Sequence, residues 1–206
     1  IDAYEVKGRG EIGVGRLVRA LGELGGEKFP DKEIEKFVNL YKSKSDTKGE
    51  KFTLVSGDKI SYWYDEDNYY EDWGDASLAG SCMRDVDSSY FDIYVNNPKV
   101  CKLLILTRKD SEGEEKLIGR ALVWKLAGPQ EITYMDRVYT HDDSDVELFK
   151  EYARKMKWYY KEWNDSSNDS PIVAPDGEKI EKILTVEIQK GRYDKYPYVD
   201  TLKYFD

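Results

Sequence analysis

The chain reads Val100-Cys-Lys-Leu-Leu-Ile-Leu-Thr107, then Leu117-Ile-Gly-Arg-Ala-Leu-Val-Trp-Lys-Leu126, then Ile132-Thr-Tyr-Met-Asp-Arg-Val-Tyr139, and these three runs decide its fold. Each run is rich in aliphatic, β-branched and aromatic residues and has the length of a strand. A polar turn with Gly113 joins the first two runs, and Gly128-Pro129 joins the second to the third. Short turns of this kind connect neighbouring antiparallel strands. The sequence therefore predicts a three-stranded meander.

A helix is predicted directly after the third strand. Ser144-x-x-Glu147 matches a capping box, in which two side chains satisfy amide groups at a helix start. The helix should run to about Tyr159, with an apolar stripe that packs on the sheet and consists of Val146, Leu148, Phe149, Tyr152, Ala153 and Met156. After a polar loop over residues 164–177, the run Ile183-Leu-Thr-Val-Glu-Ile188 predicts one further strand.

The N-terminal part is predicted to be helical. Residues 11–24 place apolar side chains on one helical face, with Gly25-Gly26 as the stop, and Asp31 can cap a second helix over 31–41. Residues 42–51 contain no apolar residue and are typical of a linker. We therefore predict two domains: an N-terminal helical segment, 1–45, and an α+β domain, 52–206, whose mostly antiparallel sheet is flanked by helices.

Composition limits the classes of function. The chain has 206 residues, 35% of them charged, and a net charge of −9, so a phosphate backbone would be repelled unless a local basic patch overrode that field. No such patch is visible, and no apolar run reaches the roughly 18 residues of a membrane span. Cys82 and Cys101 lack the spacing of a zinc or redox pair. We expect a cytoplasmic protein that binds neither nucleic acid nor membrane, and no metal. Because the chain begins at Ile1, we also expect it to be a piece of a longer protein.

The order of strands and helix over residues 100–160, with the phrases Lys116-Leu-Ile-Gly-Arg-Ala-Leu122 and Tyr134-Met-Asp-Arg-Val-Tyr139, resembles the GCN5-related N-acyltransferase (GNAT) superfamily. The resemblance implies a GNAT-like sheet. In that superfamily a loop of the form Arg/Gln-x-x-Gly-x-Gly/Ala binds the pyrophosphate of acetyl-coenzyme A. Here the junction reads Thr140-His141-Asp142-Asp143-Ser144-Asp145, whose carboxylates would stabilise a helix start and repel a phosphate. We therefore predict no cofactor site.

Two other patterns could carry chemistry. The stretch Gly8-Arg9-Gly10-Glu11-Ile12-Gly13 matches the GxGxxG pattern of dinucleotide-binding loops, but no buried strand precedes it. Cys82 lies near Arg84, which could lower the pKa of the thiol, and with the lone His141 and an aspartate it could form a catalytic set. The alternative is that Cys82 only packs, as a small apolar residue does.

The segment from Tyr62 to Asp75 mixes aromatic and acidic residues without a consistent period, which predicts a loop. Its aromatic side chains could pack onto the core. Alternatively, the segment could form a recognition surface for a basic partner, because tyrosine and tryptophan supply rigid contact area and carboxylates attract cations. The residues of that predicted surface are Tyr64, Asp65, Asp67, Tyr69, Tyr70, Asp72 and Trp73. Asp65, Asp67 and Glu71 lack the glycine and the spacing of a calcium-binding loop.

Several phrases resemble uncharacterised proteins encoded by tailed bacteriophages: Gly80-Ser-Cys-Met-Arg84, Tyr90-Phe-Asp-Ile-Tyr94, Leu117-Ile-Gly-Arg-Ala-Leu-Val-Trp-Lys125 and Tyr196-Pro-Tyr-Val-Asp-Thr201. The resemblance implies a setting, the cytoplasm of an infected bacterium, and brings no activity with it. We therefore expect a non-enzymatic phage accessory protein that binds a host or phage macromolecule, such as a basic nucleic-acid-processing protein. The alternatives are an acyltransferase-like enzyme with an unconventional cofactor site and a virion structural protein.

Overall fold

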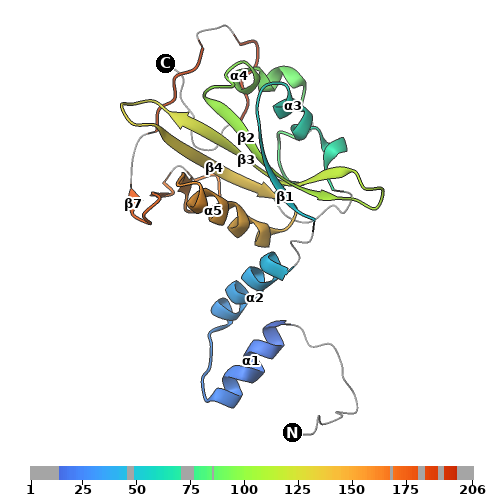
Figure 1. The fold of residues 1–206 in the computed structure, drawn as a ribbon, viewed down its shortest axis with the longest axis vertical. Coiled ribbons are helices and arrows are strands. Elements are labelled where there is room, and N and C mark those ends of the chain that lie inside the picture. Colours follow the sequence, from blue (N-terminus) through green and yellow to red (C-terminus); the bar gives the residue numbers. More distant parts are fainter. Residues whose placement is uncertain are drawn as a thin grey trace. The chain divides into compact units, whose positions relative to one another are not determined.

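The computed structural model describes residues 14–45, 49–70, 77–84, 86–167, 169–180, 184–189 and 193–198. Its chain divides into two compact units, 1–47 and 48–206. The first unit holds a pair of helices, and the second is an α+β unit with a seven-stranded, mostly antiparallel sheet (Figure 1). The predicted fold class is therefore confirmed.

The helical pair of the first unit is α1 (Val14–Gly25) and α2 (Asp31–Ser45). Gly26, with a φ of 77°, follows α1, and the N–H of Glu27 donates to the carbonyl of Gly22 over 2.8 Å. The two helices also meet through an ion pair of 2.7 Å between Arg19 and Asp31. Because α2 continues to Ser45 and the first strand begins at Lys51, the linker predicted over 42–51 is wrong at both ends.

The sheet of the second unit has its strands in chain order from edge to edge, and every neighbouring pair is antiparallel except the parallel pair β4 and β5. A helix, α5 (Val146–Lys155), makes the crossover between these two strands. The strands are β1 (Lys51–Val55), β2 (Cys101–Lys109), β3 (Glu115–Leu126), β4 (Ile132–Thr140), β5 (Tyr159–Lys161), β6 (Ile172–Val173) and β7 (Lys179–Ile180).

The predicted meander is confirmed as β2, β3 and β4. The turn between the first two is held by the carboxylate of Asp110, which accepts from the N–H groups of Glu112 and Glu114 over 2.9 Å each. Gly113 has a φ of 90°, a conformation that a residue with a Cβ rarely adopts. Local sequence and fold agree throughout this part of the chain.

Two predicted element ends and one predicted strand are wrong. A short turn of 3₁₀ helix, η3 (Asp143–Asp145), precedes α5, and its cap is Asp142 rather than Ser144. The helix ends at Lys155, because Lys157 takes a φ of 57° and the N–H of Trp158 bonds back to the carbonyl of Ala153. The run predicted as a strand at 183–188 joins no strand over its described residues 184–188, although the N–H of Ala127 donates to the carbonyl of Thr185.

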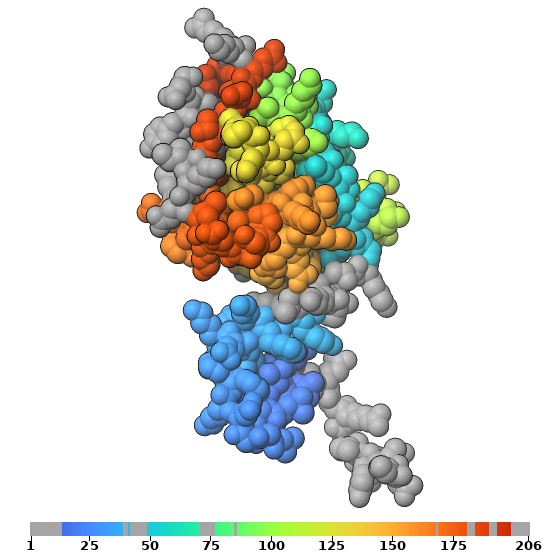
Figure 2. All heavy atoms as spheres, turned by 60° about the vertical axis from the view of Figure 1, so that its left-hand side comes forward, coloured from blue at the N-terminus to red at the C-terminus, as the bar shows by residue number. Residues whose placement is uncertain are grey.

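Apolar side chains cover both faces of the sheet. On one face α5 packs through Phe149 and Ala153, and a Cβ on Gly119 would lie 2.8 Å from the Phe149 ring, so this helix approaches β3 closely. Figure 2 shows this side of the unit, with α5 in orange near the cyan residues of β1, whose Phe52 ring meets Phe149 edge-on.

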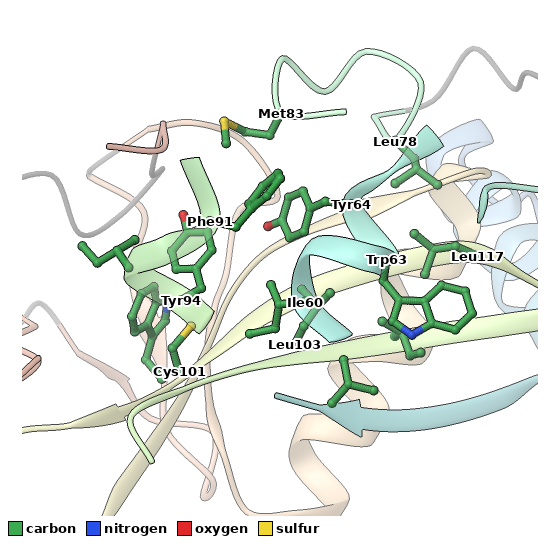
Figure 3. Close-up of a cluster of buried hydrophobic side chains, with 14 of the residues drawn as sticks. Ile60, Trp63, Tyr64, Leu78, Met83, Phe91, Tyr94, Cys101, Leu103 and Leu117 are labelled. Carbon is green, nitrogen blue, oxygen red and sulfur yellow. The ribbon is translucent and has the colours of Figure 1, made fainter. Parts of the chain in front are cut away.

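The other face is covered by short helices that lie between β1 and β2 in the sequence. They are α3 (Lys59–Tyr64), α4 (Asp92–Val95) and the 3₁₀ helices η1 (Glu66–Asn68) and η2 (Ser88–Phe91). Their side chains form a dense aromatic core against β2 and β3, in which Tyr94 lies near Cys101 and Tyr64 near Phe91 (Figure 3). Within the described residues, no helix has the length and apolar character needed to cross a membrane.

Candidate functional site

The predicted acidic and aromatic surface is partly wrong, because part of it lies in the core. Tyr64 is only 6% exposed and Tyr69 only 9%, so neither side chain is open to a partner. The segment is also not a loop at its start, since α3 continues through Tyr64 and η1 follows. Asp65 and Asp67 are exposed as predicted, and Tyr70 is half-buried. Asp72 and Trp73 lie outside the described residues.

The backbone of this segment is fixed by several hydrogen bonds. The carboxylate of Asp65 accepts from the N–H of Asp67 over 3.1 Å, and the amide of Asn68 donates to the carbonyl of Tyr62 over 2.7 Å. Two further bonds tie the segment to β3. The ammonium of Lys116 donates to the carbonyl of Asp67, and the N–H of Tyr70 donates to the carbonyl of Leu117. The two exposed carboxylates are therefore carried on an ordered backbone.

A buried arginine, Arg120, contacts two tyrosines of this segment from inside the core. Arg120, on β3, is 1% exposed and donates to the hydroxyls of Tyr69 and Ser81, the second over 2.8 Å. Its guanidinium carbon lies 4.0 Å from the centre of the Tyr64 ring, a cation–π contact. The rings of Tyr69 and Tyr139 lie at 5.4 and 5.5 Å. Arg120 thus holds the inner side of the acidic segment through two of its tyrosines.

Tyr64 and Tyr69 stay neutral beside Arg120. Burial raises the pKa of Tyr64 and of Tyr69, and Arg120 opposes that shift without cancelling it. The Tyr69 hydroxyl can therefore accept from Arg120 and donate to the carbonyl of Tyr64, over 3.1 Å. Arg120 was not among the residues predicted from the sequence. The signal was present, because an arginine at the centre of an apolar strand must be buried and needs partners.

The outer side of the segment borders a groove of about 520 Å³ between β1 and α3. Tyr62 lines it and is 55% exposed, with its ring edge-on to Trp63. Charged side chains of both signs also line the groove: Lys51, Asp58, Lys59 and Glu115. Tyr62 was not in the predicted surface, yet it is the exposed tyrosine of α3.

Of the predicted catalytic set, Cys82 is exposed and forms no disulfide. The His141 ring packs edge-on against Tyr70, with ring centres 6.0 Å apart. Arg84 donates to the carbonyl of Ala79 and faces Glu66 at 3.6 Å.

The β4–α5 junction does not fit a pyrophosphate. The carboxylate of Asp142 accepts from the N–H of Ser144 over 2.8 Å, so the protein itself fills the place where an anion would bind. Asp143 and Asp145 add two more carboxylates in the same turn. The glycine-rich stretch Gly8–Gly13 lies outside the described residues. Among those described, no group of three or more His, Cys, Asp or Glu side chains is placed to hold a metal ion.

A search of protein-family models, of curated proteins and of solved structures finds no match to this chain.

Proposed function

We propose that this protein is a non-enzymatic binding protein that recognises a basic segment of another protein. The recognition surface consists of the exposed residues Asp58, Tyr62, Asp65 and Asp67, which we call the acidic ridge. The observation that carries this proposal is the contrast within one segment: Tyr64 and Tyr69 are held inside by Arg120, while Tyr62 and the carboxylates are exposed.

Order in the free protein favours binding. A surface loop that must be ordered on association loses part of its interaction free energy to that ordering. The acidic ridge is already held by the Asn68 and Lys116 hydrogen bonds and by the two tyrosines on Arg120. A partner would therefore meet a surface that needs little rearrangement.

Charge selects the kind of partner. Three of the four ridge residues are carboxylates, and the whole chain carries a net charge of −9. Such a field attracts positively charged proteins and raises their association rates. Tyr62 supplies an aromatic contact of the kind that often dominates binding energy. An arginine or lysine side chain could reach a ridge carboxylate and stack on the Tyr62 ring at the same time.

The setting in this proposal is the cytoplasm of a bacterium infected by a tailed phage, and the partner is a host or phage protein with a basic, nucleic-acid-processing surface. The acyltransferase alternative gains no support from the Asp142 junction. The virion alternative is separated by counting copies of the protein in purified particles, since a structural role requires many.

The proposal is tested with isotope-labelled protein of residues 1–206 and an arginine-rich peptide. We expect amide resonances of residues 58–67 to shift, and the charge-reversed variant Asp65→Lys/Asp67→Lys to bind more weakly by on the order of tenfold or more. The matched control is Asp169→Lys/Glu178→Lys, which changes the net charge equally at exposed positions near the opposite edge of the sheet.

Two results would contradict the proposal. Equal loss of affinity in both double variants would show that only net charge matters. Shifts confined to other residues would place the binding surface elsewhere. In infected cells, a near-stoichiometric partner should be recovered with the parent and the control variant and lost with the ridge variant, and recovery of no such partner would count against the idea.

A further inference from the structure

Arg120 is a buried charge whose side-chain hydrogen bonds do not go to a carboxylate. Its side chain is almost completely enclosed, and it forms no salt bridge in the described part of the chain. Its hydrogen bonds go to two neutral hydroxyls, those of Tyr69 and Ser81. Removing an ion from water costs roughly several kcal/mol unless an opposite charge or a full set of hydrogen bonds compensates. The two hydroxyls compensate for only part of that cost here.

One hydrogen-bond donor of Arg120 has no partner. The Nε–H group is buried and has no acceptor within hydrogen-bond distance. Buried donors are satisfied in the great majority of cases, so an unsatisfied one on a cation points to an acceptor that the protein chain does not supply. The same side chain lines a cavity, together with Asp136, Arg137, Tyr139 and Tyr198.

The size of the cavity limits what it can hold. Its volume is about 20 Å³. Measured in the same way, one water molecule needs roughly 10–15 Å³. A phosphate or a nucleotide does not fit, whereas a monatomic ion or one oxygen of a carboxylate group does. The partly exposed Tyr198, at 52%, borders the cavity, so a larger molecule could place only its end there.

The local charges favour an anion. Asp136 and Arg137 are adjacent and of opposite sign, and the carboxylate of Asp136 accepts from the N–H of Arg137 over 2.8 Å and from the Tyr134 hydroxyl at 3.5 Å. The charged side chains that line the cavity are Arg120, Arg137 and Asp136, two cations and one carboxylate, so its lining is net positive.

We propose that this cavity is an anion site, in which a halide ion or one carboxylate oxygen of a small ligand accepts the Nε–H of Arg120. The tyrosine rings of the cavity wall hold the guanidinium in place. Asp136 weakens the site by repulsion, which sets its affinity and makes it selective against dianions. This inference does not depend on the acidic ridge, because the cavity lies on the inner side of the segment.

The site is tested by thermal unfolding of the full chain with chloride, bromide or formate, exchanged for a bulky organic anion at constant ionic strength. We expect saturable stabilisation, because an anion that binds only the folded state raises its stability with concentration. Asp136→Asn, which removes the repelling charge, should tighten binding by on the order of tenfold. Arg120→Gln should abolish it. Stabilisation by halides alone assigns a free ion, and stronger stabilisation by formate assigns a carboxylate ligand.

Arg154→Gln is the matched control, because it removes one arginine charge while leaving the cavity intact. Arg154 also lies over a tyrosine, at 5.5 Å from the Tyr160 ring centre, but its Nε donates to the Tyr160 hydroxyl over 3.1 Å. This variant should keep the full anion response.

If Arg120→Gln does not fold, crystals soaked in bromide decide the question: an anomalous peak next to Arg120 Nε supports the site. No peak there, no saturable stabilisation of the parent and Asp136→Asn proteins, or an unchanged response in Arg120→Gln would overturn it.

Discussion

Four ionisable side chains in the aromatic core stay neutral because they are buried. Tyr64, Tyr94 and Cys101 are enclosed beside β2 and β3, and burial raises the pKa of each above its ordinary value (Figure 3). Arg120 lowers the pKa of Tyr64 in part, while Asp136 adds to the rise for Tyr94 and Cys101. Burial also raises the pKa of Tyr69, at the edge of this group, and Arg120 lowers it in part.

These shifts predict a loss of stability in alkaline solution. Above about pH 9 to 10 the unfolded chain releases the tyrosine and cysteine protons while the folded protein keeps them. The folded state then binds more protons, so the free energy of unfolding falls as pH rises. Tyr94→Phe should reduce the steepness of that fall by about one proton. Urea unfolding at several pH values between about 8 and 11 measures it.

The matched control for this prediction is Tyr62→Phe, which removes a hydroxyl from a side chain that is more than half exposed. We expect it to leave the pH dependence as in the parent. If Tyr94→Phe and the parent show the same slope, the Tyr94 hydroxyl is not held neutral by the core.

At the scale of elements, the parallel pair of β4 and β5 is short and is extended by a side chain. The register pairs only Tyr134 with Tyr159 and Met135 with Tyr160. Further along β4, the amide of Asn164 takes the place of a strand: its Oδ1 accepts from the N–H of Val138 over 2.8 Å, and its Nδ2 donates to the same residue's carbonyl over 3.0 Å. One side chain thereby satisfies both backbone groups.

Replacing that side chain should therefore destabilise the sheet. Asn164→Ala leaves both backbone groups of Val138 without this partner, and we expect a loss of roughly 1–3 kcal/mol in the free energy of unfolding. Asn164→Asp keeps the acceptor for the N–H of Val138 but sets a carboxylate oxygen against its carbonyl, so it should not restore the stability of the parent. Ser166→Ala, at an exposed position in the same loop, should change little. Equal stability of Asn164→Ala and the parent in urea unfolding would contradict this role.

At the scale of the whole molecule, the two units differ in how much they bury. Both apolar cores of the second unit consist of residues from Phe52 onward. Among the residues of the first unit whose side chains are described, only Gly22 and Ile34 are buried, while Leu21 and Leu24 are 58% and 85% exposed. The second unit has the contacts of an independent fold, and the helical pair does not.

Removing residues 1–47 should accordingly leave the second unit folded. We expect the 48–206 chain to unfold cooperatively within a few degrees of the parent, because no residue of either core is lost. The isolated 1–47 peptide should show little helix by circular dichroism, since helices of 12 and 15 residues need packing to be stable in water. A truncated chain without a cooperative transition would refute the independence of the second unit.

The sequence by itself determined the elements whose signals are local. Runs rich in aliphatic, β-branched and aromatic residues, separated by the turns at Gly113 and Gly128, indicated neighbouring strands, and an apolar stripe after the third run indicated a helix on the sheet. The chemistry of the β4–α5 junction was also local, because carboxylates at a helix start bond to its amides wherever the helix lies. These parts of the prediction needed no knowledge of the rest of the fold.

Only the tertiary structure decided which tyrosines face inward and which run becomes a strand. A tyrosine has an apolar ring and a polar hydroxyl, so residue type alone does not tell the buried Tyr64 from the exposed Tyr62; the face that α3 turns to the sheet does. The run at 183–188 alternates as a strand does, but β5, β6 and β7 form that end of the sheet instead. Arg120 owes its burial, its tyrosine partners and its cavity to segments far apart in the chain, and such pairings have no local signal.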